Sequence, residues 1–304
     1  MSVSTEIDRL LRHSMLARAQ PIIRGKAPWL HKALLVARDA VLPVRSIHGL
    51  TRYQREALDR FATFRRAETG PVLEIGSDVD GRVLKELASQ DVNRPVGLNV
   101  EVNTAAYAEG RTAEGLQYDV VVGDARHLPF DTQSISSIFS VATFEHIHDI
   151  DVALREMYRV LKPGGVLYSN FGPIWSCSIG HHVFAAADGV EARHWKPGLN
   201  PVPHYAHLLM APTELRSAVL QKSWVTPNLA DAIVSWIYEG RGVNRVFYDD
   251  YVRSFRASSF AVRVLAPVRE HVPARVTREL RRRYPDCHDF SVRMVEAVLE
   301  KAVS

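Results

Sequence analysis

The sequence predicts a doubly wound α/β fold with a mostly parallel sheet. Apolar, β-branched runs of strand length alternate with helical segments between residues 71 and 170, and the first run stops at Gly76. Two further strand-like runs flank a helical segment near the C-terminus. Because strands that alternate with helices are joined by crossover connections, their sheet is mostly parallel.

Each element of the alternation follows from its local pattern. Short runs rich in Val, Ile and Leu predict five strands, at residues 71–76, 95–100, 117–122, 136–141 and 165–170. Helical spacing of apolar residues predicts helices at 82–89 and 149–161. At residues 161–165 the Pro163-Gly164-Gly165 turn is expected to end the second helix. These elements place a central core at residues 69–171.

Three segments surround this core. Residues 1–68 show helical spacing broken by prolines and are expected to form a helical, basic prefix. Residues 172–253 lose the alternation and are rich in Trp, His, Pro and Gly, which predicts an insertion or lid that shapes a substrate site. In residues 254–304, strands at 259–265 and 292–299 around a helix at 274–284 are expected to complete the core.

Charge and composition narrow the class of protein. The 304 residues carry a net charge of +4, but the prefix alone has 13 Lys/Arg and 6 Asp/Glu. This excess fits a solvated helical face, or a surface that meets an anionic partner or the membrane periphery. We expect no nucleic-acid partner, since no recognised motif is present. There is no apolar run of about eighteen residues. With no secretory signal and only Cys177 and Cys287, we expect a cytoplasmic protein.

The loop after the first predicted strand carries chemistry. Parallel strands hand over to helices at the carboxyl edge of a sheet, where ligands usually bind. Glycine there lets the backbone approach a ligand closely. A nicotinamide site would need three spaced glycines, but Asp78 and Asp80 occupy this loop and would repel a pyrophosphate. The loop therefore suits a cationic ligand better, which disfavours a nicotinamide-dependent oxidoreductase.

Residues 72–170 resemble the class I S-adenosylmethionine-dependent methyltransferases, of the type 11-like group. Val72–Gly81 resembles their first motif, with Glu74 as the acidic residue and Gly76 as the first glycine, although Asp78 and Asp80 replace the next two. Gly123-Asp124-Ala125 with Leu128-Pro129-Phe130 is similar to a later turn, and Leu161–Gly165 to the turn before the fifth strand. Asn99 departs from the pattern, because the second strand of the family usually ends in an acidic residue.

The resemblance implies a seven-stranded sheet of Rossmann type and S-adenosyl-L-methionine as methyl donor. It assigns Asp124 to the adenine amine and Asn99 to the ribose hydroxyls. The full set of expected donor-binding residues is Glu74, Gly76, Ser77, Asp78, Gly81, Asn99, Asp124, Ala125 and Ser140.

The expected reaction is direct displacement at the methyl group, which needs a base only if the acceptor must lose a proton. His146 follows the fourth strand, and His181 and His182 leave from the end of the fifth, so these three are the candidate bases. Trp175, His204 and His207 are candidate substrate contacts, although each histidine could instead be a structural one. His204 and His207 have a spacing that could ligate a metal, but no carboxylates complete the set, so we expect none.

The sequence thus predicts O-methylation of a small-molecule, glycan or natural-product acceptor. N-methylation is the nearest alternative. A protein of a different class, a catalytically silent methyltransferase-like binding module, stays open because of the altered glycine loop and Asn99. A homodimer also stays open.

Overall fold

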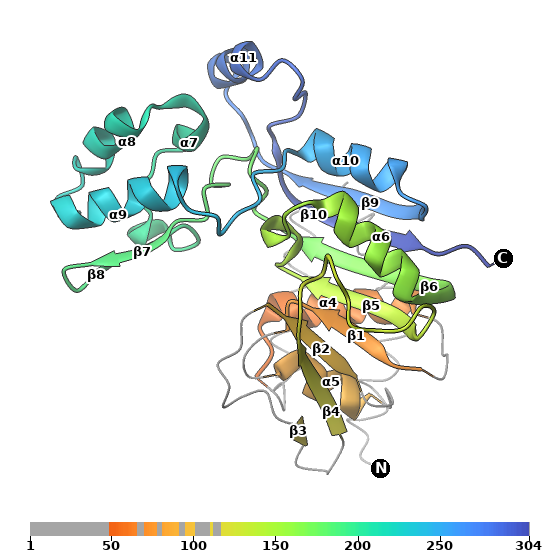
Figure 1. The fold of residues 1–304 in the computed structure, drawn as a ribbon. Helices are drawn as coiled ribbons and strands as arrows, with labels where there is room; N and C mark the ends of the chain where they lie inside the picture. The colour runs from red at the N-terminus through yellow and green to blue at the C-terminus, as the bar shows by residue number, and fades with distance from the viewer. Residues whose placement is uncertain are drawn as a thin grey trace, which may run out of the picture.

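The computed structural model describes residues 49–65, 70–77, 81–90, 95–100, 110–111 and 117–303. It contains a large sheet with helices on both faces, beside a smaller group of helices and a hairpin (Figure 1). The expectations for residues 1–48, 66–69 and 78–80 lie outside these residues. Within the described part of the chain, no helix is long and apolar enough to cross a membrane.

The sheet has the predicted doubly wound arrangement. Its strands lie in the order β3-β4-β2-β1-β5-β6-β10-β9, and β10 is antiparallel to both of its neighbours. β4, β2, β1, β5 and β6 are parallel. The bounds are β1 Val72–Ile75, β2 Val96–Asn99, β4 Gln117–Val122, β5 Ile135–Val141, β6 Leu161–Phe171, β9 Ala261–Arg269 and β10 Val292–Glu300, with a two-residue β3, Gly110–Arg111, at the edge. The predicted seven-stranded, Rossmann-type fold is confirmed, and β3 is a short addition to it.

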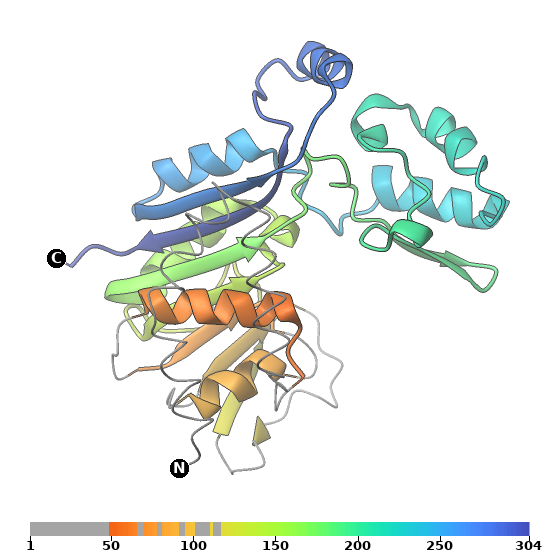
Figure 2. The same cartoon turned by 180° about the vertical axis from the view of Figure 1, so that it is seen from behind.

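Helices cover the two faces of the sheet. α4 (Arg52–Phe64) and α5 (Arg82–Ser89) lie on one face, and α6 (Ile150–Val160) and α10 (Tyr248–Ala257) on the other (Figures 1 and 2). Each face of the sheet has its own hydrophobic core, and successive side chains of a strand point to the two cores in turn, as in any pleated strand. In β1, for example, Val72 packs with the α4 side and Leu73 with the α6 side. This double burial explains why the central strands read as continuous apolar runs.

The largest differences from the predicted boundaries lie at the start of β6, four residues before the expected residue 165, and at the end of β9. α6 ends at Val160, earlier than expected, because Leu161 is already extended and β6 starts there. Only Gly164 of the turn has a left-handed φ, at 78°. β9 runs to Arg269 through Pro267, beyond the expected end at residue 265. It can do so because it is an edge strand, in which a missing backbone N–H is tolerated.

Residues 172–247, referred to below as the insertion, build a second hydrophobic core. They contain the hairpin β7 (Phe184–Ala187) and β8 (Val190–Arg193), and the helices α7 (Ala206–Leu209), α8 (Pro212–Val219) and α9 (Pro227–Tyr238). α11 (Ala274–Arg283) joins this core through the buried Leu280, and the Tyr284 hydroxyl donates to the Leu208 carbonyl at 3.0 Å. α10, by contrast, packs its Tyr251 and Phe255 into the core of the sheet.

Candidate active site

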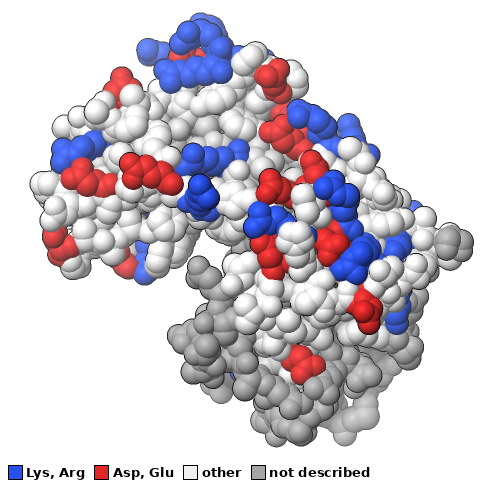
Figure 3. All heavy atoms as spheres, viewed as in Figure 1, with Lys and Arg blue, Asp and Glu red and all other residues white. Residues whose placement is uncertain are grey.

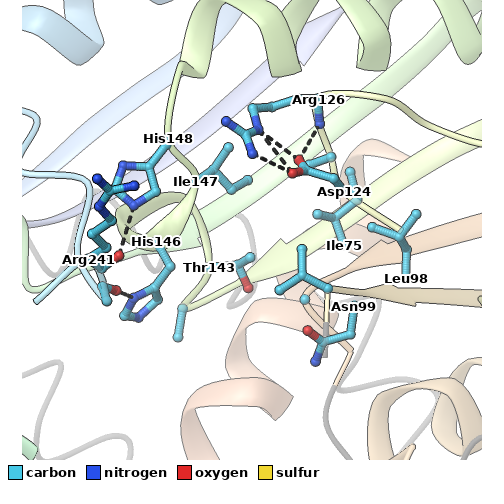
Figure 4. Close-up of a pocket in the computed structure, with 15 residues that line it drawn as sticks. Ile75, Leu98, Asn99, Asp124, Arg126, Thr143, His146, Ile147, His148 and Arg241 are labelled. Atoms are coloured by element: carbon cyan, nitrogen blue, oxygen red, sulfur yellow. Dashed lines mark hydrogen bonds and ion pairs between the residues drawn. The ribbon is translucent and has the colours of Figure 1, made fainter. Parts of the chain in front are cut away.

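A cavity of about 580 Å³ lies at the carboxyl ends of β1, β2, β4 and β5 (Figure 4). This is the edge at which α/β sheets bind ligands, and the volume is in the range of ligand pockets. Residues from the four strand ends and from the end of the insertion line it: Ile75, Gly76, Leu98, Asn99, Val100, Asp124, Ala125, Arg126, Ala142, Thr143, His146, Ile147, His148, Arg241 and Gly242. Of the residues predicted from sequence, it gathers Gly76, Asn99, Asp124, Ala125 and His146.

Gly76 lets the loop after β1 approach the segment after β5. Its φ is +83°, and a Cβ atom placed there would lie 2.0 Å from Thr143 Oγ1. Both the backbone conformation and the space therefore require glycine. The floor of the cavity depends on this contact between two strand ends.

Asn99 is held in place at the end of β2. Its Nδ2 donates to the backbone oxygen of Ser77 at 2.9 Å, so the amide is fixed between the first and second strand ends. An amide can both donate to and accept from a hydroxyl group. In Figure 4 Asn99 and Leu98 lie at the opposite end of the cavity from His146 and Arg241.

The Asp124 carboxylate is paired with Arg126 at the cavity wall. Arg126 Nη2 lies 2.6 Å from Asp124 Oδ2 and its Nε 3.0 Å from Oδ1, while the Arg126 backbone N–H donates to Oδ1 at 2.8 Å. Arg126 also pairs with Asp149 at 3.0 Å. These hydrogen bonds hold the pKa of Asp124 below its usual value, so the carboxylate is charged. It is an acceptor of fixed orientation.

The segment after β5 carries two histidines that meet the insertion. His146 Nδ1 contacts the Gly242 carbonyl oxygen, and His148 Nε2 contacts that of Arg241 at 2.8 Å. Because a carbonyl oxygen only accepts, His146 carries its proton on Nδ1, which leaves Nε2 with a lone pair in the neutral ring. Surrounding protein displaces water and lowers the pKa of His146, so the ring is neutral at neutral pH.

Glu145 lies behind this segment and is almost fully buried. Its Oε1 accepts from the Gly172 N–H at 3.1 Å, whereas Oε2 has no hydrogen-bond partner within the part of the chain that the structure describes. Burial raises the pKa of Glu145 to about 8. The sequence places Glu145 beside His146 at the edge of the sheet but does not predict its burial, which depends on contacts with segments distant in the chain.

The structure does not bring His181 and His182 into the cavity lining. Both are buried in the insertion: His182 Nε2 contacts the Pro173 carbonyl oxygen, and His181 Nδ1 accepts from the Val183 N–H at 3.1 Å. Burial lowers the pKa of His182 to about 3 and that of His181 well below its usual value. His182 nevertheless contacts the site, since its ring lies 5.2 Å from that of His146.

The candidate substrate contacts are also distributed. Trp175 and His207 are buried against each other, with ring centroids 4.7 Å apart, and His207 Nε2 donates to the Trp175 carbonyl at 2.8 Å. His204 is exposed at the surface of the insertion. No group of three or more His, Cys, Asp or Glu in a metal-ligating arrangement occurs among the described residues.

The other predicted donor residues of the described chain are not part of the cavity lining. Glu74, Ser77 and Ser140 are buried, and Ser140 Oγ donates to the Ile75 carbonyl at 3.0 Å. Gly81 begins α5 with a φ of +59°. Asp78 lies outside the described residues. The cavity is lined instead by sequence neighbours of these residues, such as Ile75 and Gly76.

The family profile described as a methyltransferase domain matches residues 73–169, which hold β1 to β6 and four of the strand ends that line the cavity. Residues 73–169 of this chain therefore form a methyltransferase domain of the class I S-adenosylmethionine-dependent type. The methyl donor of the domain is S-adenosylmethionine. The resemblance on which the sequence prediction rested is thereby confirmed.

Individual relatives match parts of this chain, mainly the methyltransferase domain. Methyltransferase GfsG of Streptomyces halstedii is 37% identical over 99 residues, which cover 32% of this chain and 35% of the relative. The 24-methylenesterol C-methyltransferase 2 of Oryza sativa is 28% identical over 166 residues, 52% of this chain and 44% of the relative. The chain thus spans between a third and a half of the length of these curated relatives.

Among solved structures, the chain is similar to the YcgJ protein of Bacillus subtilis. The TM-score is 0.46 at 15% identity, with 82% of this chain and 100% of the other covered.

Several lining residues of the methyltransferase site were not predicted. Arg241 and Gly242 are about a hundred residues from the His146 segment, and no local pattern marks them. Arg126 stands two residues after Asp124, so its pairing with that carboxylate could have been inferred from the sequence. Thr143 could have been found only from the close approach to Gly76.

Proposed function

We propose that this methyltransferase methylates a hydroxyl group of a small-molecule or natural-product acceptor, with His146 as the base. The observation that carries the proposal is the position of His146: it lines the donor cavity with Nδ1 engaged by the Gly242 carbonyl. A hydroxyl must lose its proton as it attacks a methyl group, and a neutral imidazole nitrogen is suited to accept it.

The residues of the cavity fit the donor. Asn99 offers an amide for the ribose hydroxyls, and the Asp124 carboxylate can accept from the adenine amine. Ile75 and Leu98 offer apolar contacts to the adenine ring. When bound, S-adenosylmethionine supplies a methyl group on a positively charged sulfur. With the adenosine at the Asn99 end, the opposite end with His146 and Arg241 is left for the acceptor.

In this arrangement the chain positions two reactants and moves one proton. Holding them in line is the larger contribution to rate, because it replaces a bimolecular encounter. Gly242 fixes the tautomer and orientation of His146, so that the acceptor hydroxyl can donate its proton to Nε2. The acceptor oxygen then forms its bond to the methyl carbon as the carbon–sulfur bond breaks.

The experiment is a titration calorimetry series with S-adenosylmethionine and S-adenosylhomocysteine, followed by incubation with labelled donor and a panel of hydroxylated, aminated and carbon-nucleophile acceptors. We expect both donor forms to bind and the label to appear on oxygen. Label on nitrogen or carbon would contradict O-methylation. Absence of donor binding would contradict the proposal that this protein is a methyltransferase.

A second candidate is a methyltransferase-like module that binds the donor without turning it over. The pairing of Asp124 with Arg126 favours it, since the adenine amine would have to share an already paired carboxylate. Such a module would bind S-adenosylhomocysteine but release no label with any member of the panel.

A further inference from the structure

Two aromatic side chains at the edge of the insertion are exposed to solvent. Phe184 and Trp195 are 48% and 49% exposed, although most large apolar side chains of the described residues are buried. Their rings are nearly parallel, with centroids 5.9 Å apart. Exposed aromatic pairs of this kind are typical of binding surfaces, because each ring offers a large apolar face at little entropic cost.

The hairpin holds these rings in a fixed orientation. Phe184 pairs with Arg193 across β7 and β8, and the Arg193 guanidinium lies 4.4 Å from the Phe184 centroid and 5.3 Å from that of Trp195. Glu191 holds the guanidinium with an Nη2–Oε2 distance of 2.6 Å. Cation–π contacts of this kind orient the rings before any ligand arrives.

A continuous series of rings joins this surface to the cavity. His146 lies 5.2 Å from His182, His182 lies 4.7 Å from His194, and His194 lies 4.9 Å from Trp195. The hairpin lies on the side of the insertion turned away from α8 (Figure 1). In the view of Figure 3 the molecular surface is hollowed below the insertion. The series passes through the buried His182, and it places the aromatic pair three ring contacts from His146 at the acceptor end of the cavity.

We propose that Phe184 and Trp195 bind the apolar body of the methyl acceptor, which is an extended ring system or chain that reaches from Trp195 to His146. The inference rests on the proposed function, because it assigns the acceptor of that same reaction. Three ring contacts separate the two ends, so an acceptor that touches both must be longer than a single ring. Its nucleophile would lie at the His146 end and its apolar face on the aromatic pair.

The test uses the full chain saturated with S-adenosylhomocysteine and two phenolic probes of different length. The probes are 2-naphthol, with two rings, and 17β-estradiol, with four, and their affinities are measured by titration calorimetry. We expect the longer probe to bind about tenfold more tightly, the gain expected from one buried aromatic face. Trp195→Ser or Phe184→Ser should each remove most of that advantage.

The matched control is Val262→Ser, which replaces an exposed apolar side chain on the edge strand β9, away from the insertion. It should leave both affinities unchanged. Equal affinities of the two probes, no binding of either, or an equal loss in the control would overturn the inference. Light scattering adds one more outcome: a wild-type dimer that Trp195→Ser dissociates would make this surface a subunit interface instead.

The two proposals fail separately. If S-adenosylhomocysteine does not bind, the proposed function fails. If it binds with unchanged affinity in all variants while the probes show no preference, only the aromatic acceptor surface fails.

Discussion

The sheet and the insertion use polar side chains near the candidate site in different ways. In the sheet, polar side chains gather at the strand ends, where Asn99 and Asp124 line an open cavity. In the insertion, His181, His182 and His207 are buried inside the second core, and backbone groups occupy at least one nitrogen of each ring. The sheet thus offers polar groups to a ligand, while the insertion uses them to hold its own irregular backbone.

This difference predicts that the two regions respond differently to substitution. Gly76 in the sheet and Gly189 in the hairpin both have positive φ, but a Cβ atom at Gly76 would collide with Thr143, whereas one at Gly189 meets nothing within 4 Å. Gly76→Ala should lower the free energy of unfolding by about 2–5 kcal/mol and abolish detectable donor binding.

Gly189→Ala is the matched control and should cost only the backbone strain, about 1 kcal/mol, with donor affinity unchanged. Urea unfolding and titration calorimetry measure both variants. Equal losses of stability and of donor affinity in the two variants would show that backbone strain at positive φ accounts for both effects. The close approach of Gly76 to Thr143 would then not be needed to form the cavity.

The second prediction separates chemistry from donor binding. His146→Gln removes the proposed base but can still donate to the Gly242 carbonyl, so turnover should fall about 100-fold or more. Affinity for S-adenosylhomocysteine should change by less than about twofold, since we propose that adenosine binds at the other end of the cavity. His204→Gln, at the exposed face of the insertion, should alter neither quantity; a fall in turnover equal to that of His146→Gln would contradict the assignment.

The third prediction concerns acid. Burial lowers the pKa of His182 to about 3 and that of His207 to about 4, so the unfolded chain binds more protons than the folded one below pH ~6.5. Stability is therefore full above that pH and falls as pH drops toward 4, by up to about 1.4 kcal/mol per pH unit for each ring. Tryptophan fluorescence is a suitable reporter, because Trp175, Trp195, Trp224 and Trp236 lie in the insertion.

His207→Gln should make this acid slope shallower, because its amide can donate to the Trp175 carbonyl and does not titrate. An unchanged slope in His207→Gln would show that other groups control the acid sensitivity of the insertion.

The fourth prediction concerns Glu145, which lies where the sheet meets the insertion. Its effect on stability is the smallest, and its pH dependence is opposite in sign to that of the histidines. Burial raises the pKa of Glu145 to about 8, so the folded state binds more protons than the unfolded one between pH ~4.5 and 8. Its contribution is therefore lost as pH rises, by about 2 kcal/mol from pH 6 to 8. Glu145→Gln keeps the acceptor for the Gly172 N–H, and its stability relative to wild type should grow over this range. A difference that is constant with pH would contradict the raised pKa.

The same contrast explains what could be predicted from the sequence. β1, β4 and α5 match their expected bounds to within a residue or two, because a buried parallel strand is a short continuous apolar run and an amphipathic helix has a characteristic period. Asn99 and Asp124 were assigned from the resemblance to the methyltransferase family, and both line the cavity. The insertion has no such period: its histidines were recognised, but their burial depends on packing between distant segments. The contact of Gly242 with His146 is of the same kind.

The most direct measurement is a crystal structure of the complex with S-adenosylhomocysteine, which would show where the adenine, the ribose and the sulfur lie in the cavity. The account predicts adenine beside Asp124, ribose hydroxyls on Asn99 and the sulfur facing His146 across the space left for the acceptor. A sulfur turned away from His146, or a ligand bound outside this cavity, would contradict it.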